Sequence, residues 1–274
     1  MIEQIEHSDD IRLTHYSGMT DMDARLRREG VEGFYVAEGS SVIARAIAAG
    51  HAVVSTLCIA KWIDEISNLG LPESTPMYVA DESILRATTG FHVHRGALAI
   101  FRRPTALTVM DVISEARVVL VLEDLVDHAN VGAAFRSGSG LGVDAIIVSP
   151  RCADPLYRRA IKTSMGATLG MPWARAEHWP AALGQLVSAG FDVWGLTPRS
   201  EATTLAHAVA MEHPRIAVVV GTEGEGLSDV ALQACSRLVR IPMYNDVDSL
   251  NVAAASAVAM YAISSTLHSR GEAI

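Results

Sequence analysis

Three runs rich in valine and isoleucine constrain the fold of this chain most strongly. They cover residues 118–122, 144–149 and 216–221. A strand without polar alternation is buried on both faces, and such strands are typical of largely parallel sheets covered by helices. Segments of helical character lie between the runs. The sequence therefore predicts an α/β fold for the second half of the chain.

The β–α alternation extends over most of the chain. A first, smaller α/β domain is predicted at 1–104 and a second domain at 105–274, with a linker around residues 104–108. Residues 1–20 are expected to be irregular, and a helix is expected from Arg25. The other expected elements are strands at 34–37, 53–60, 77–79, 96–101, 192–196 and 238–241, and helices at 38–49, 130–141, 157–166, 179–189 and 250–266.

Composition excludes several classes of protein. The chain has 274 residues, of which 50% are apolar, so it can bury two cores. No run approaches the roughly 18 apolar residues of a membrane span. The polar, acidic N-terminus resembles neither a signal peptide nor a transit peptide. The three cysteines are far apart, which indicates no disulfide framework or metal site, so we expect a cytoplasmic protein.

The net charge of −9 argues against a general nucleic-acid binder, because such proteins are usually basic. Net charge does not locate charge, however. Basic clusters occur at 25–28, 102–103 and 158–162. Each is either a solvated face or a local contact for an anionic partner.

Ligands of open parallel sheets bind beyond the carboxyl ends of the strands. Three polar junctions, at 123–136, 221–227 and 242–251, follow predicted strands and are expected at that edge. In the first junction a helix is expected to begin near Asn130, which could be its N-cap. Arg136, expected to be semi-buried, either pairs with a carboxylate at 123–124 or meets a phosphate or a reacting oxygen.

The other two junctions are equally open to two interpretations. Three glycines within residues 221–226 allow the backbone to curl around a ligand, and Glu223 could cap a turn or accept a hydrogen bond from that ligand. In the third junction Pro242 fixes the chain as it leaves the strand. Ser249 and Asn251 then flank the start of an alanine-rich helix, as caps or as site residues.

Together the three junctions resemble the motifs of the SpoU (TrmH-like) RNA ribose 2′-O-methyltransferases of the SPOUT superfamily. The likeness covers roughly residues 117–266. It is carried by Asn130-x-Gly-x-x-x-Arg136, by Gly221-x-Glu223-x-x-Gly-Leu and by Ile241-Pro-Met followed by Ser249-Leu-Asn251. Residues 20–103 are similar to a small RNA-binding domain, related to ribosomal proteins, that precedes the methyltransferase domain in many members.

The resemblance implies a trefoil knot in the C-terminal domain, a homodimer and S-adenosylmethionine (SAM) as co-substrate, with no metal. The helix over 252–263 is apolar nearly all round, which agrees with burial against both the knot and a partner subunit. By family analogy, main-chain groups that bind SAM are expected at Leu196, Thr197, Pro198, Gly221, Ile241, Met243 and Leu250.

The resemblance also implies RNA as the partner and a catalytic set composed of Arg136, Asn130, Glu223, Ser249 and Asn251. Since a guanidinium stays protonated, we expect Arg136 to hold a phosphate and to stabilise negative charge on the 2′-oxygen. The RNA-binding domain favours ribosomal RNA over tRNA. A tRNA 2′-O-methyltransferase, a base-nitrogen methyltransferase and a non-catalytic RNA-binding protein remain alternatives.

Overall fold

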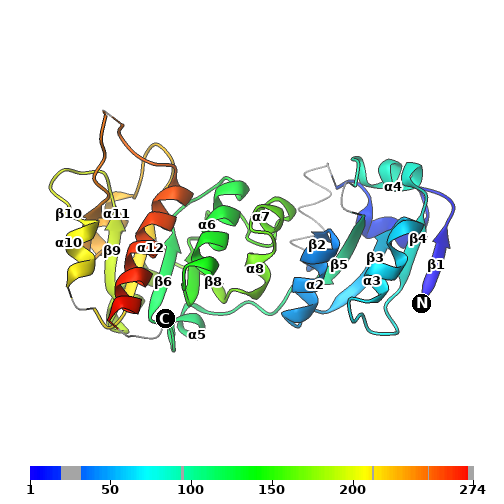
Figure 1. Cartoon of the computed structure of the whole chain (residues 1–274), viewed down its shortest axis with the longest axis horizontal. Coiled ribbons are helices and arrows are strands. Elements are labelled where there is room, and N and C mark those ends of the chain that lie inside the picture. The colour runs from blue at the N-terminus through cyan, green and yellow to red at the C-terminus, as the bar shows by residue number, and fades with distance from the viewer. Residues whose placement is uncertain (20–31, 94–95, 212, 246, 271–274) are drawn as a thin grey trace. The chain divides into compact units, whose positions relative to one another are not determined.

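The computed structural model describes residues 1–19, 32–93, 96–211, 213–245 and 247–270. The helix expected from Arg25 and the basic cluster at 25–28 lie outside these residues. The chain divides into two compact units (Figure 1). The first contains Met1–Thr105 and Leu156–Gly170, and the second contains Ala106–Pro155 and Met171–Ile274. The second half of the chain thus contributes a segment to the first unit, which a boundary at residue 104 does not describe.

The first unit is built on a five-stranded mixed sheet in the order β1-β4-β3-β5-β2. β5 is antiparallel to β2 and β3, and the other pairs are parallel. The strands are β1 (Ile2–Ile5), β2 (Phe34–Glu38), β3 (Val53–Cys58), β4 (Met77–Ala80) and β5 (Ala97–Arg102). The helices are η1 (Ile11–Tyr16), α2 (Ser40–Ala48), η3 (Ala60–Trp62), α3 (Ile63–Ser67), α4 (Glu82–Thr89), α7 (Arg158–Thr163) and α8 (Ala167–Gly170).

The prediction that residues 1–20 are irregular was wrong. β1 pairs with β4, and the amino group of Met1 donates to the carbonyl oxygen of Thr75. Leu13 and Tyr16 of η1 are fully buried, and the Tyr16 hydroxyl lies 2.8 Å from the Ser55 hydroxyl. A four-residue strand carries too short a pattern to be recognised, and its partner 75 residues away decides its conformation.

The second unit is built on a seven-stranded sheet whose strands are all parallel, in the order β10-β12-β9-β11-β6-β7-β8. The strands are β6 (Val118–Leu122), β7 (Ala145–Val148), β8 (Trp173–Arg175), β9 (Asp192–Leu196), β10 (Thr203–Thr204), β11 (Ile216–Val220) and β12 (Arg237–Arg240). The helices are α5 (Val109–Ile113), α6 (His128–Gly140), α9 (Ala181–Ser188), α10 (Leu205–Ala210), α11 (Asp229–Ala234) and α12 (Val252–Ser269).

Two apolar cores lie on the two faces of this sheet. Side chains of β6 alternate between them: Leu120 packs with α6, α10 and α12, whereas Val119 and Val121 pack with α5, α9 and α11. All five residues of β6 are buried, as are all five of β11. The buried valine and isoleucine runs therefore form the centre of a three-layer α/β/α sandwich, and the predicted α/β class is confirmed.

Candidate functional site

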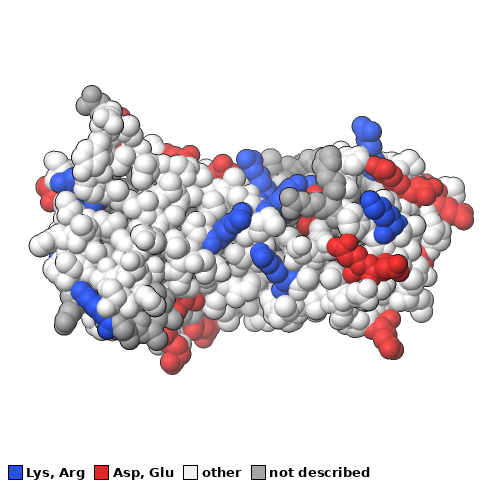
Figure 2. Space-filling model, in the orientation of Figure 1, with Lys and Arg blue, Asp and Glu red and all other residues white. Residues whose placement is uncertain are grey.

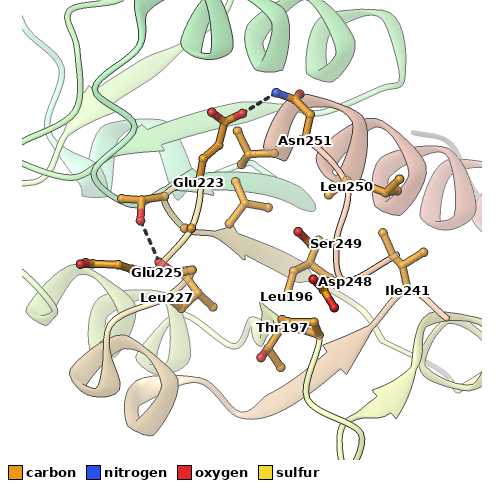
Figure 3. Close-up of a pocket in the computed structure, with 18 of the residues that line it drawn as sticks. Leu196, Thr197, Glu223, Glu225, Leu227, Ile241, Asp248, Ser249, Leu250 and Asn251 are labelled. Atoms are coloured by element: carbon orange, nitrogen blue, oxygen red, sulfur yellow. Dashed lines mark hydrogen bonds between the residues drawn. The ribbon is translucent and has the colours of Figure 1, made fainter. Parts of the chain in front are cut away.

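A cavity of about 460 Å³ lies in the second unit, beyond the carboxyl ends of β9, β11 and β12. Ligand sites of parallel α/β sheets occupy this edge, where loops lead from the strands into the N-termini of helices. Three segments form its walls: the residues after β9, the glycine-rich loop after β11 and the connection from β12 to α12 (Figure 3). All seven residues predicted to bind the cofactor line the cavity: Leu196, Thr197, Pro198, Gly221, Ile241, Met243 and Leu250.

The glycine-rich loop is closed by its own backbone. Thr222 and Gly226 exchange two main-chain hydrogen bonds of 3.1 Å each. Gly221 is buried beneath this closure, and a Cβ atom there would lie 2.2 Å from the carbonyl oxygen of Gly226. Gly224 and Gly226 adopt positive φ angles of 93° and 73°, which L residues rarely adopt. The tight turn therefore needs glycine for two reasons, close approach and backbone conformation.

Asn251 joins the three predicted motifs. Its Oδ1 accepts hydrogen bonds from the amides of Ala253 (2.9 Å) and Ala254 (3.3 Å), so it is the N-cap of α12. Its Nδ2 donates to Oδ1 of Asn130 at 3.1 Å and to Oε1 of Glu223. Figure 3 shows Glu223 and Asn251 facing each other at the cavity. One side chain thus caps the helix and holds groups from the first and second motifs in place.

The alternative capping prediction is confirmed for Asn251 but was wrong for Asn130 and Ser249. α6 begins at His128 with Asp127 as its N-cap, so Asn130 lies inside the first turn and its side chain is available to Asn251. Ser249 does not cap α12. It lines the cavity, and within the described part of the chain its hydroxyl makes no hydrogen bond. Both positions therefore present polar groups that helix capping does not require.

Arg136 lies on α6 but does not line the cavity. It is exposed, not semi-buried as expected, and it makes no hydrogen bond or ion pair with another described residue. The alternative ion pair with the carboxylates at 123–124 is also excluded. Asp124 is paired with Arg151, and Glu123 bonds to Trp179 and Ser228. Three of the five predicted catalytic residues, Glu223, Ser249 and Asn251, thus line the cavity. Asn130 does not line it but is bonded to Asn251, and Arg136 is an exposed cation.

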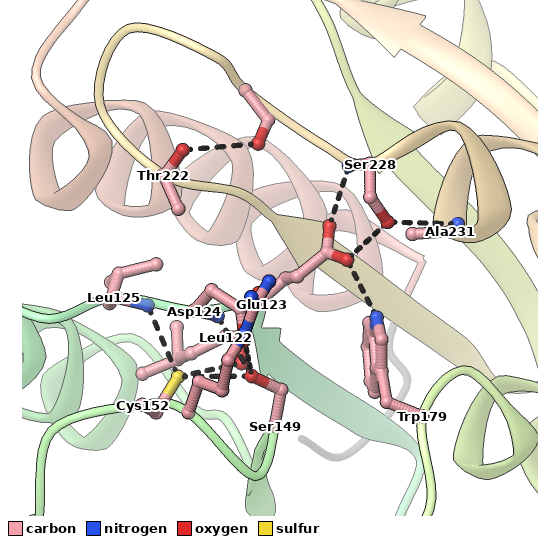
Figure 4. A network of polar contacts seen from close by, with 12 residues as sticks. Leu122, Glu123, Asp124, Leu125, Ser149, Cys152, Trp179, Thr222, Ser228 and Ala231 are labelled. Carbon is pink, nitrogen blue, oxygen red and sulfur yellow. Dashed lines mark hydrogen bonds and ion pairs between the residues drawn. The ribbon is translucent and has the colours of Figure 1, made fainter.

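Glu123 supports the glycine-rich loop, a role that the sequence did not reveal. Its side chain is buried at the end of β6 (Figure 4). Oε1 accepts from Nε1 of Trp179 at 2.6 Å and from the hydroxyl of Ser228, and Oε2 accepts from the amide of Ser228 at 3.0 Å. Ser228 follows the glycine-rich loop directly and is the N-cap of α11. Glu123 therefore fixes the end of a cavity wall.

Asp124 forms a second buried polar network beside Glu123. Burial alone raises the pKa of Asp124, but hydrogen bonds from Arg151 and Ser149 outweigh this effect and hold the pKa below its ordinary value. The Ser149 hydroxyl donates to Oδ1 at 2.6 Å and accepts from the Asp124 amide at 2.8 Å. Asp124 has a positive φ of 54°, which is uncommon for a residue other than glycine. These contacts hold the chain in the sharp turn that leaves β6.

Over the described ranges, no group of three or more His, Cys, Asp or Glu side chains is arranged to hold a metal ion. In the same ranges no helix combines the length and apolar character needed to cross a membrane. Cys58, Cys152 and Cys235 are all free thiols.

The sequence matches the model of the SpoU rRNA Methylase family over residues 117–261. It is 38% identical to an uncharacterized tRNA/rRNA methyltransferase of Mycobacterium bovis over 95% of this chain and 91% of the relative. It is 31% identical to a 23S rRNA (guanosine-2′-O-)-methyltransferase, RlmB, of a Burkholderia species, over 71% of this chain and 79% of that protein.

Solved structures share the fold. An AdoMet-bound rRNA methyltransferase from Sinorhizobium meliloti superposes with a TM-score of 0.84 and 18% identity, covering 97% of this chain and 98% of its own. The SpoU methyltransferase AviRb from Streptomyces viridochromogenes superposes with a TM-score of 0.78 and 18% identity, and the match covers 95% of this chain and 98% of AviRb. The family match and the extent of identity confirm the resemblance based on the three motifs. This chain belongs to the SpoU family of RNA methyltransferases.

Proposed function

We propose that this protein transfers a methyl group from SAM to a ribose 2′-hydroxyl of structured RNA, most simply ribosomal RNA. The observation that carries the proposal is the convergence of the three motifs on one cavity through Asn251. The relatives support it: one is named a 23S rRNA (guanosine-2′-O-)-methyltransferase, and a solved structure of the same fold holds AdoMet.

The cavity suits a cofactor of the size and charge of SAM. Its volume of about 460 Å³ lies within the range of small-molecule sites. Apolar walls from Leu196, Ile241 and Leu250 fit an adenine ring. The charged residues of the lining are Glu223, Glu225, Asp248 and Arg199, so carboxylates outnumber cations. An acidic lining favours a positively charged ligand, and SAM carries a sulfonium and an ammonium group.

In this proposal the chain contributes positioning and electrostatics. When bound, SAM supplies an electrophilic methyl group. Asn130, Glu223, Ser249 and Asn251 orient the ribose and the methionyl end of the cofactor. Arg136, exposed and without an ion-pair partner among the described residues, holds an RNA phosphate and stabilises the negative charge that develops on the 2′-oxygen. Its guanidinium stays protonated, so the role is electrostatic.

A trefoil knot in the second domain, and a homodimer formed through that domain, are part of the proposal. α12 is not buried all round in the single chain: Val258 is 41% exposed and Tyr261 is 62% exposed. Tyr244 and Val247, in the connection to α12, are also exposed. Val258 and Tyr261 are three residues apart and so lie on one face of α12. Exposed apolar faces of this kind mark interaction surfaces. We assign this surface to contact with a second copy of the chain. The first domain is proposed to bind RNA, and the protein is proposed to act in the cytoplasm.

The proposal is tested by two measurements on the purified full-length chain. Calorimetry with SAM is expected to give saturable binding. Incubation with radioactive SAM and total RNA from cells that lack this protein is expected to label ribosomal RNA. Labelling of tRNA alone would favour the tRNA enzyme. SAM binding that is absent, together with unlabelled RNA, would favour the non-catalytic RNA-binding protein and refute the proposal.

A further inference from the structure

The segment Leu156–Gly170 belongs to the first unit although it lies, in sequence, between strands of the second. Its helices are α7 and α8. α7 packs against β2, and α8 packs against α2. The segment contains Arg158, Arg159 and Lys162 and no Asp or Glu. In a chain with a net charge of −9, this surface carries the opposite sign.

Part of this positive charge has a structural role. Glu38, at the end of β2, has a side chain that is only 3% exposed. Its Oε2 accepts a hydrogen bond from Nε of Arg158 at 2.9 Å, and Nη2 of Arg158 lies 2.8 Å from the same oxygen. Nζ of Lys162 lies 3.5 Å from Oε1. The Arg158 guanidinium also stacks 3.7 Å from the ring centre of Phe91. A buried carboxylate needs a counter-charge, and Arg158 supplies it.

Three further side chains of this surface are accessible to solvent. The Arg159 side chain is exposed, and that of Lys162 is half exposed. Arg45 of α2 is also exposed, and its guanidinium donates to the carbonyl oxygen of Met165 between α7 and α8. Figure 2 shows Lys and Arg side chains gathered over α2, α7 and α8, whereas most acidic side chains of this unit lie over its other elements. Arg158 and Lys162 thus contact the buried carboxylate, and Arg45 and Arg159 add positive charge on α2 and α7.

We propose that Arg45, Arg159 and Lys162 form a contact surface for the phosphate backbone of the RNA substrate. This inference rests on the proposed function, because an RNA methyltransferase must hold a polyanion beyond the nucleotide that it modifies. Phosphate contacts from Lys and Arg supply most of the sequence-independent affinity for RNA. Such a surface gives an acidic protein a local RNA contact without attracting nucleic acid over its whole surface.

The test compares two double variants of the full-length protein by fluorescence anisotropy with a labelled RNA hairpin, without SAM, between about 50 and 200 mM salt. Arg159→Ala with Lys162→Ala is expected to weaken binding about tenfold and to reduce the log–log salt slope by about 1.5. The matched control is Lys61→Ala with Arg86→Ala, which removes the same charge from exposed residues of η3 and α4. The control is expected to match wild type.

Several readouts separate this contact from a structural effect. Both double variants are expected to keep the wild-type melting temperature and affinity for SAM. Arg159→Lys with Lys162→Arg keeps the charge and is expected to keep the salt slope. An unchanged slope in the alanine variant, or an equal loss in the control, would overturn the inference. So would tighter binding of polyglutamate than of RNA at this surface. The proposed function is tested separately in the wild-type protein. It fails if that protein neither binds SAM nor methylates RNA, whatever the salt slope of the variants.

Discussion

At the scale of single residues, the site depends on a few polar side chains that each hold more than one partner. Asn251 caps α12 and also binds Asn130 and Glu223. Glu123 holds Trp179 and Ser228 with both oxygens. Arg136 is the exception, because it is exposed and has no partner within the described residues. In the proposed reaction the preorganised groups position the ligand, whereas the exposed Arg136 contacts the RNA.

Replacing Arg136 is expected to affect chemistry and not cofactor binding. Arg136→Ala should lower kcat about 100-fold, because a group that stabilises developing charge is lost. Arg136→Lys should recover part of the rate, since the charge remains but the two-pronged guanidinium does not. SAM affinity measured by calorimetry should stay at the wild-type value in both. Wild-type methyl transfer by Arg136→Ala would show that the assigned role is wrong.

Replacing Glu123 tests the support of the glycine-rich loop. The carboxylate accepts three hydrogen bonds, and a glutamine would direct its NH₂ group toward one of those donors. Glu123→Gln should therefore reduce the free energy of unfolding by about 2 kcal/mol, measured by denaturant titration, and should weaken SAM binding. Glu115→Gln, at an exposed carboxylate that follows α5, is the control and should change neither quantity by a comparable amount. Equal effects in the two variants would contradict the role of Glu123.

At the scale of elements, strand–loop junctions determine the site. The loops after β9, β11 and β12 meet because parallel strands place their carboxyl ends at one edge. The buried strands and this edge could be predicted from sequence, since valine and isoleucine runs have a distinct pattern. β1 could not, because an edge strand of four residues depends on its pairing with β4. The exposure of Arg136 and the contacts of Glu123 depend on tertiary packing, which no local pattern encodes.

The glycine-rich loop depends on the absence of a side chain at Gly221. A methyl group at Gly221 would meet the Gly226 carbonyl oxygen at 2.2 Å, so Gly221→Ala must displace the loop backbone. We expect at least about tenfold weaker SAM binding by calorimetry, corresponding to about 1.4 kcal/mol. Gly184→Ala is the control, because Gly184 is exposed on α9 and its added methyl meets no atom within 4 Å. That variant should gain up to about 1 kcal/mol of stability. Normal SAM affinity in Gly221→Ala would contradict the loop's role.

In the whole molecule, the two units are proposed to have different roles, catalysis in the second and RNA binding in the first. The second unit holds the cavity, and the first presents the basic surface of α2 and α7. The segment 156–170 lies in the second half of the sequence but folds with the first unit, which a single division of the chain at residue 104 could not have shown. The family motifs identified the enzyme class from sequence. The basic cluster at 158–162 was also visible there, but its position beside α2 in the first unit is known only from the structure.

The proposed dimer depends on the exposed apolar face of α12. Wild-type protein should have twice the 29.2 kDa mass of one chain by light scattering. Tyr261→Asp places a charge on the exposed apolar face of α12 and should shift the equilibrium toward the monomer. Val187→Asp, at an exposed apolar position on α9, is the matched control and should remain dimeric. A monomeric wild type would refute the assigned interface.

In the proposed reaction the methyl group of SAM reaches a ribose oxygen. The most direct test is to digest RNA methylated by the purified protein to nucleosides and to identify the product by mass spectrometry. Isotope-labelled SAM marks the added methyl group. We predict that the label fragments with the ribose, as a 2′-O-methylnucleoside, in ribosomal RNA. A label that fragments with the base would contradict the account and would assign the enzyme to base methylation.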